Sequence, residues 1–121
     1  MKKIIGVFAL ALSGVMDASH AVSSEDCEKL ISASDTERAM ACLDVQRKLA
    51  SLELIEVYQD KLKALPKKDR PALISAQKSW EANLKSCTSE LVIEMESDYL
   101  NVMLCEIGKI RERRMELKAP N

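Results

Sequence analysis

From residue 22 onward, apolar residues recur at the three- and four-residue steps typical of α-helices. The longest periodic segment begins at Ser34, which forms a capping-box pattern with Glu37, and runs to about Leu65. Its charged residues fall mainly on the opposite face from the apolar ones. This segment is therefore predicted to be an amphipathic helix with one apolar stripe, made up of Val45, Leu49, Leu52, Ile55, Tyr58, Leu62 and Leu65.

Three further helices are predicted around this one. A short helix covers about residues 24–32, and a third begins near Arg70, after the interruption by Pro66 and Pro71. A fourth runs to about Leu117, with a turn before it near residues 94–98 that uses Ser97 as its cap. The apolar positions of the third helix are Leu73, Ala76, Trp80, Leu84 and Cys87, together with Gln77, and those of the fourth are Leu100, Met103, Leu104, Ile107, Ile110 and Leu117. The predicted fold is all-α, a small bundle of about four helices arranged as helical hairpins.

The first 21 residues have the pattern of a secretion signal. Lys2 and Lys3 precede an apolar run over residues 4–16, and Ser19-His20-Ala21 forms a small-x-small cleavage site. The run has 13 residues, whereas a membrane-spanning helix needs about 20. We expect a signal peptide over residues 1–21, a single domain over 22–121 with no membrane insertion, and a periplasmic or secreted protein.

Charge and composition limit the kinds of function that can be expected of the exported chain. Without residues 1–21 it carries 16 basic and 18 acidic side chains, which argues against a nucleic-acid partner. The only histidine, His20, leaves with the signal, and Gly108 is the only remaining glycine. Histidine-based nucleophile systems, histidine-ligated metals and glycine-rich phosphate loops are therefore not expected. Catalysis by two carboxylates stays formally open, but no pair stands out among the 18 acids. We predict a protein that is not an enzyme and needs no cofactor.

Four cysteines lie downstream of the signal, and their spacing matches two helical hairpins. Cys27 and Cys42 are nearly equidistant from Ser34, and Cys87 and Cys105 flank Glu96 by nine residues each. Four cysteines allow three pairings, and we predict Cys27–Cys42 and Cys87–Cys105 because each closes a short local loop. A four-thiolate zinc site is the alternative, but the chain has no CxxC pair and exported proteins are normally oxidised.

The motif residues resemble a known family. A cysteine pair is followed by Leu54-x-x-x-Tyr58-x-x-x-Leu62, then Ala76-Gln77-x-x-Trp80, two more cysteines, and finally Arg113 with Leu117. This order resembles the LprI-like lysozyme-inhibitor family of small exported bacterial proteins, over about residues 27–117. The chain departs from the family pattern at Ser51, Ile55 and Leu84. The resemblance implies a protein partner, with lysozyme as the first candidate.

Structural and binding roles are then divided among these residues. Trp80 and Tyr58 are expected in the core, whereas Gln77 is either a buried strut between helices or a surface residue. The basic run at the end of the last helix is interpreted as a solvated helix end: Lys109, Arg111, Arg113, Arg114 and Lys118. The predicted partner-binding residues are the acidic ones near the last turn, because lysozymes are typically basic: Glu90, Glu94, Glu96 and Asp98.

Two functions are consistent with these features. The first is non-covalent inhibition of a lysozyme, or of a related cell-wall hydrolase, by occupation of its cleft. The alternative is an envelope structural or adaptor protein that binds another partner through its apolar and charged helix faces. An ordinary charged turn is the plain alternative to the acidic binding site.

Overall fold

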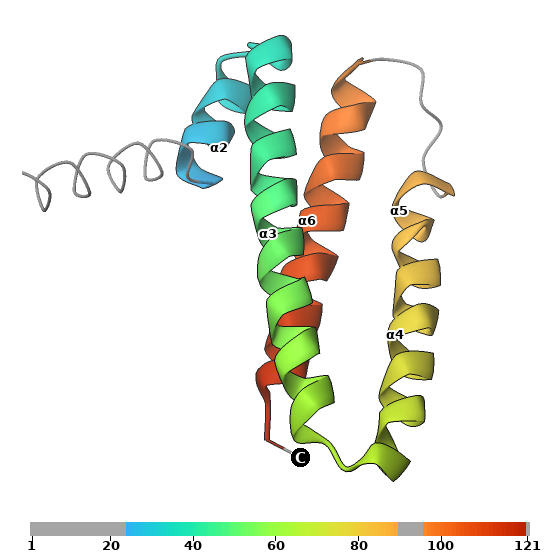
Figure 1. Ribbon diagram of the computed structural model, residues 1–121. Coiled ribbons are helices and arrows are strands. Elements are labelled where there is room, and N and C mark those ends of the chain that lie inside the picture. The colour runs from blue at the N-terminus through green and yellow to red at the C-terminus, as the bar shows by residue number, and fades with distance from the viewer. Residues whose placement is uncertain (1–23, 90–95, 121) are drawn as a thin grey trace, which may run out of the picture.

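Five α-helices and one 3-10 turn make up the described residues, 24–89 and 96–120, of a computed structural model. Two long helices, α3 and α6, lie side by side and run in the same direction, and α4, which comes between them in sequence, runs in the opposite direction (Figure 1). The all-α bundle predicted from the sequence is therefore confirmed. The elements are α2 (Ser24–Ser32), α3 (Thr36–Ala64), η1 (Lys67–Asp69), α4 (Arg70–Leu84), α5 (Ser86–Ser89) and α6 (Glu96–Lys118).

The turn between α2 and α3 differs from the expected capping box. Ser34 has a φ of 58°, and the amide of Asp35 donates to the carbonyl of Leu30 while that of Ser34 donates to Ile31. These two bonds form a Schellman motif that ends α2, so Ser34 is the left-handed residue after a helix and does not cap the next one. Asp35 precedes α3 and makes no side-chain capping bond. The turn still places the two flanking helices antiparallel, as a hairpin requires.

The second predicted cap is also wrong. Ser97 and Asp98 lie inside α6, which begins at Glu96. The remainder of the turn expected near residues 94–98 falls outside the described residues.

Both predicted disulfides are present. The Cα atoms of Cys27 and Cys42 lie 5.5 Å apart and those of Cys87 and Cys105 lie 5.7 Å apart, each pair joined through sulfur. The first bond ties α2 to α3, and the second ties α5 to α6. All four cysteines are used in this way, so the alternative of a four-thiolate zinc site is not what the structure contains.

The buried face of α3 is not the stripe indicated by the sequence. Val45, Leu49, Leu52 and Ile55 are all exposed, and the buried residues of α3 are instead Ala39, Leu43, Gln46, Ala50 and Leu54. The small side chains of the two alanines allow α6 to lie close against this face. Arg47 and Glu53 flank it, and each reaches a partner of opposite charge on α6.

The core is divided into an upper and a lower cluster along the α3–α6 contact. The upper cluster lies beside the Cys27–Cys42 bond and contains Leu43, Leu100, Met103 and Ile107. The lower cluster is built on Ala50, Leu54, Ile110 and Leu117, and Leu73, Trp80 and Leu84 of α4 pack against it. Few Cα atoms of α4 come within 8 Å of α3 or α6, so α4 is held by its side chains.

Within the described residues, no helix is both long and apolar enough to cross a membrane.

Candidate functional site

The clearest surface feature is an apolar ridge on α3, which we define as Val45, Leu49, Leu52 and Ile55. Their exposed fractions are 38%, 43%, 64% and 49%. Steps of three and four residues place them on one face of the helix. Isolated exposed leucines are ordinary in proteins, whereas a contiguous row of large apolar side chains is typical of an interaction site.

A groove between α3 and α4 continues the ridge at Ile55. Its volume is about 370 Å³, and its walls carry Tyr58 from α3 and Trp80 from α4, both partly buried. Ile110 of α6 also lines it. The groove exists because α4 stands away from α3 and the large Trp80 side chain spans part of the separation.

A polar strut links α4 to α6 beside this groove. Arg113 Nε donates a hydrogen bond of 2.9 Å to Gln77 Oε1, and Arg113 Nη1 lies 3.1 Å from Glu116 Oε2. Gln77 is buried, with 6% exposure, and the Arg113 side chain is 13% exposed. Of the two roles left open for Gln77, the structure therefore supports the buried strut. Ala76, next to it in the same motif, is exposed.

The basic run of α6 is a set of contacts between helices rather than a solvated helix end. In addition to Arg113, Arg111 Nη2 donates to Gln46 Oε1 of α3 at 3.1 Å, and Lys109 Nζ donates to Ser86 Oγ at 2.5 Å. Arg114 Nε lies 3.5 Å from Glu53 Oε2. Helical periodicity brings these cations to faces that meet α3, α4 and α5, which a view of α6 alone does not show. Arg111 and Lys118 are exposed, and Lys118 lies at the end of the helix as expected for a solvated terminus.

Acidic residues border the apolar ridge. Glu53 and Glu56 are exposed beside Leu52, and Asp60 follows one turn later on the same side of α3. At the other end of the ridge, Asp44 Oδ2 lies 2.9 Å from Lys48 Nζ. The hydrogen bond from Lys48, with help from Arg47, lowers the pKa of the Asp44 carboxyl below its ordinary value of 3.8.

The predicted acidic binding residues are placed only in part. Glu90 and Glu94 lie outside the described residues. Glu96 is the first residue of α6, and Asp98 is half-buried in the first turn of the same helix. The binding role assigned to these four acids therefore stays a prediction.

The sequence pattern identified the ridge residues as an apolar stripe but did not predict that they are exposed, because α3 has apolar residues on two faces. Leu43, Ala50 and Leu54 also recur at helical steps, but two of the residues of that face are alanine and one is Gln46, so it is less apolar in sequence than the ridge. Side-chain size was the sequence feature that could have predicted the buried face. A long helix with small side chains on one face and large ones on another can pack closely through the face with small side chains.

No protein-family model, curated protein or solved structure matches this chain. The described residues also contain no group of three or more histidine, cysteine or acidic side chains placed to hold a metal ion. The described surface combines the exposed apolar ridge, an adjoining groove and the Gln77–Arg113 strut beside it.

Proposed function

We propose that this protein is an exported, non-catalytic binding protein, and that its first candidate partner is a lysozyme or a related cell-wall hydrolase. The observation that carries the proposal is the apolar ridge of α3 with the groove beside it. Two disulfides indicate an oxidising, non-cytoplasmic location. Periplasmic residence or secretion is part of the proposal.

A protein partner is supported by the kind of surface that the ridge presents. Fully burying an exposed leucine side chain contributes roughly 1.5–3 kcal/mol. Leu49 and Leu52 are 43% and 64% exposed, so covering each of them contributes about 1–2 kcal/mol. Half-buried Trp80 and Tyr58 beside the ridge belong to the residue types most common among energetic anchors of interfaces. The disulfide-tied bundle holds these side chains in place before binding, which lowers the entropic cost of association.

A basic partner is supported by the acids along the ridge. Glu56 and Asp60 supply this side of α3 with negative charge that no ion pair among the described residues neutralises, whereas Glu53 is paired with Arg114 and Asp44 with Lys48. Complementary charge increases the rate of encounter and selects among partners. Lysozymes are typically basic, and the motif order of the chain resembles that of lysozyme inhibitors. The ridge would occupy the cleft without a covalent step.

The test is a lysis assay with several lysozyme classes, in which the exported protein is titrated through one-to-one stoichiometry. We expect inhibition near equimolar ratio that weakens as salt is added. The variant Leu49→Gln/Leu52→Gln should weaken inhibition by at least about 10-fold, because each truncated anchor contributes on the order of 1 kcal/mol or more.

A matched control makes the same change on another helix. Leu104→Gln/Met115→Gln replaces two exposed apolar residues of α6 and should leave inhibition unchanged. A variant with Glu90, Glu94, Glu96 and Asp98 changed to their amides tests the acidic segment separately. If that variant loses inhibition and the ridge variant does not, the acidic segment carries recognition.

Absence of inhibition at large excess over every lysozyme class would refute the lysozyme assignment. The envelope adaptor would then be the better hypothesis, because it uses the same ridge for another partner.

A further inference from the structure

A second surface lies at the opposite end of the molecule from the disulfides, and its charge opposes that of the rest of the chain. Residues 60–70 contain five cations, Lys61, Lys63, Lys67, Lys68 and Arg70, against two acids, Asp60 and Asp69. This segment therefore has a net charge of +3, whereas residues 22–121 as a whole have a net charge of −2. The remaining residues of that range carry −5, so this segment is opposite in net charge to the rest of the chain.

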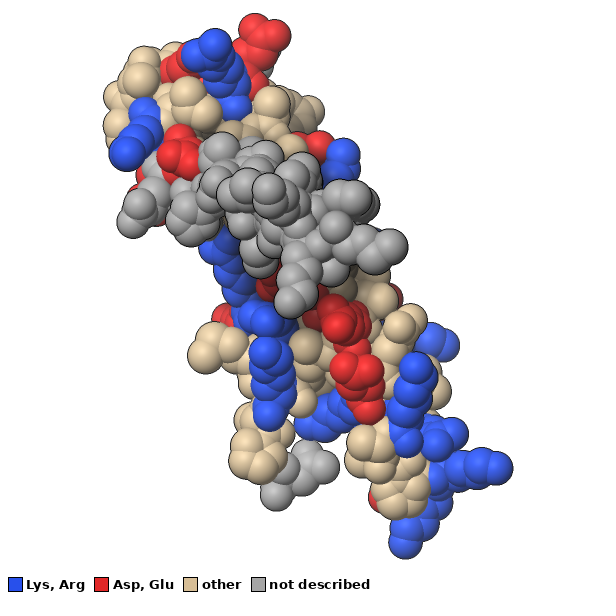
Figure 2. Space-filling view, turned by 60° about the vertical axis from the view of Figure 1, so that its left-hand side comes forward, with Lys and Arg blue, Asp and Glu red and all other residues tan. Residues whose placement is uncertain are grey.

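These cations are not neutralised by ion pairs among the described residues, and several are exposed to solvent. Lys63, Lys67 and Lys68 are exposed, and the ion pairs found among the described residues do not include any of the five. Arg70 Nε donates to the carbonyl of Leu65 at 3.2 Å, which holds the turn in shape. Lysine and arginine side chains gather at the lower end of the molecule, where this turn lies (Figure 2).

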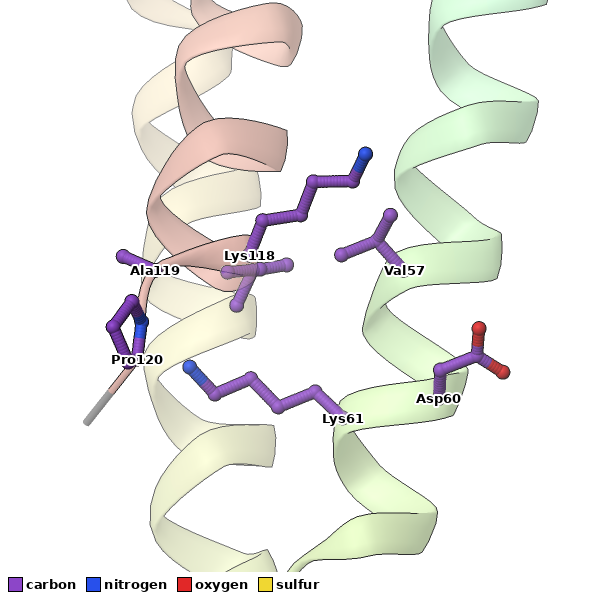
Figure 3. A pocket seen from close by; sticks show the side chains of 7 residues that line it. Val57, Asp60, Lys61, Lys118, Ala119 and Pro120 are labelled. Atoms are coloured by element: carbon purple, nitrogen blue, oxygen red, sulfur yellow. The ribbon is translucent and has the colours of Figure 1, made fainter.

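A hollow near the turn is also lined by a sixth cation, Lys118 of α6. Lys61 and Lys118 line it together with Asp60, Val57, Leu117 and Pro120, so two cations face one acid there, and its volume is about 410 Å³. The two lysine side chains cross the space between α3 and the end of α6 in opposite directions, and the Asp60 carboxylate lies at the edge of the hollow, turned outward (Figure 3). Because lysine stems are flexible, a bound anionic group would draw the two ammonium groups toward it from different helices.

We infer that this basic end, defined as Lys61, Lys63, Lys67, Lys68, Arg70 and Lys118, binds the phosphate groups of an anionic phospholipid surface. The cations form a cap at one end of an elongated bundle, which suits contact with a surface met end-on. A nucleic acid would require a longer basic track with aromatic side chains for stacking, and residues 60–70 contain no aromatic residue.

Lipid headgroup phosphates match the chemistry of this end. Clustered lysines are attracted to anionic bilayers without inserting into them, and small or apolar side chains at the turn, Ala64, Pro66 and Pro71, are exposed among the cations. The hollow would hold one headgroup phosphate between Lys61 and Lys118. The ridge of α3 runs along the side of the bundle, so this contact leaves it accessible to a partner.

The test is sedimentation of the exported protein, recovered from the export compartment, with two kinds of vesicle. One kind is pure phosphatidylcholine, and the other contains phosphatidylglycerol in addition. We expect binding to the anionic vesicles only, and loss of that binding at an ionic strength near 0.5 M, where the Debye length falls to only a few ångströms.

Two variants with the same change in charge localise the surface. Lys61→Gln/Lys67→Gln/Lys118→Gln should weaken partition onto anionic vesicles by about 100-fold, because each lysine near the surface contributes a factor of about five. Lys29→Gln/Lys78→Gln/Lys85→Gln alters exposed lysines elsewhere and should weaken it far less. Circular dichroism of both variants checks that the helices are retained.

Three results would overturn the inference. Equal binding to both kinds of vesicle would show that charge does not drive it. An equal loss of vesicle binding in the two triple variants would show that binding depends on net charge and not on the position of the basic end. Displacement from vesicles by low millimolar inorganic phosphate would show that the hollow recognises a free anion instead of a lipid surface. None of these results depends on whether the protein inhibits lysozyme.

Discussion

Replacing Gln77 by leucine should destabilise the protein by removing the acceptor for Arg113. The side chains have similar size, so the main loss is the hydrogen bond from Arg113 Nε at 2.9 Å. Hydrogen bonds to charged groups contribute roughly 1.5–3 kcal/mol, and a buried donor left unpaired costs its desolvation as well. Because the Arg113 side chain is only 13% exposed, water cannot readily replace the lost acceptor. We expect a loss of about 2 kcal/mol and a fall in Tm of roughly 10 °C.

Two companion variants separate this bond from simple packing. Gln77→Glu keeps an acceptor oxygen at the same position and should retain most of the stability at neutral pH. In the background of Arg113→Leu, the change Gln77→Leu should cost little, because replacing both partners by apolar groups leaves neither unpaired. The resulting coupling energy between the two positions should be about 1–2 kcal/mol.

The assay is urea unfolding followed by two probes. Circular dichroism at 222 nm reports all the helices, while the fluorescence of Trp80, the single tryptophan, reports α4. Since α4 is held mainly by side chains, the fluorescence transition of Gln77→Leu should move to lower urea than the helical transition. The role of the strut is refuted if Gln77→Leu unfolds at the urea midpoint of the native protein, or if Gln77→Glu is as unstable as Gln77→Leu.

Two further predictions concern the Cys27–Cys42 disulfide and the Asp44 carboxyl of α3. Cys27→Ser/Cys42→Ser opens a loop with a sequence separation of 15 and should lower the free energy of unfolding by about 3 kcal/mol; an unchanged urea midpoint would contradict this. The pKa of the Asp44 carboxyl is lowered in the folded state, first by its hydrogen bond with Lys48, so the unfolded chain takes up this proton at higher pH. Its contribution is therefore fully present above about pH 5 and lost as the pH falls through the lowered pKa. The Tm of Asp44→Asn should approach that of the native protein at low pH, and a constant difference down to about pH 2 would argue against the ion pair.

Several features followed from local sequence because they depend on neighbours along the chain. Helical periodicity and the prolines at 66 and 71 determined the all-α fold and the break between α3 and α4. The cysteine pairing was also predictable, since residues equidistant from a turn meet across a hairpin, and both bonds are present. The two caps at Ser34 and Ser97 were wrong because several turn types fit the same few residues, and only the backbone geometry selects among them.

Which face of each helix is buried was decided only by tertiary structure. A helix with two apolar faces can pack on either, and in α3 the face with Ala39 and Ala50 is buried because small side chains allow close approach of α6. The same packing exposed Leu49 and Leu52 as a ridge, turned Arg113 inward to Gln77, and brought Lys118 next to Lys61. The sequence by itself determined the helices and their covalent ties, whereas the surfaces proposed for binding exist only because distant segments meet.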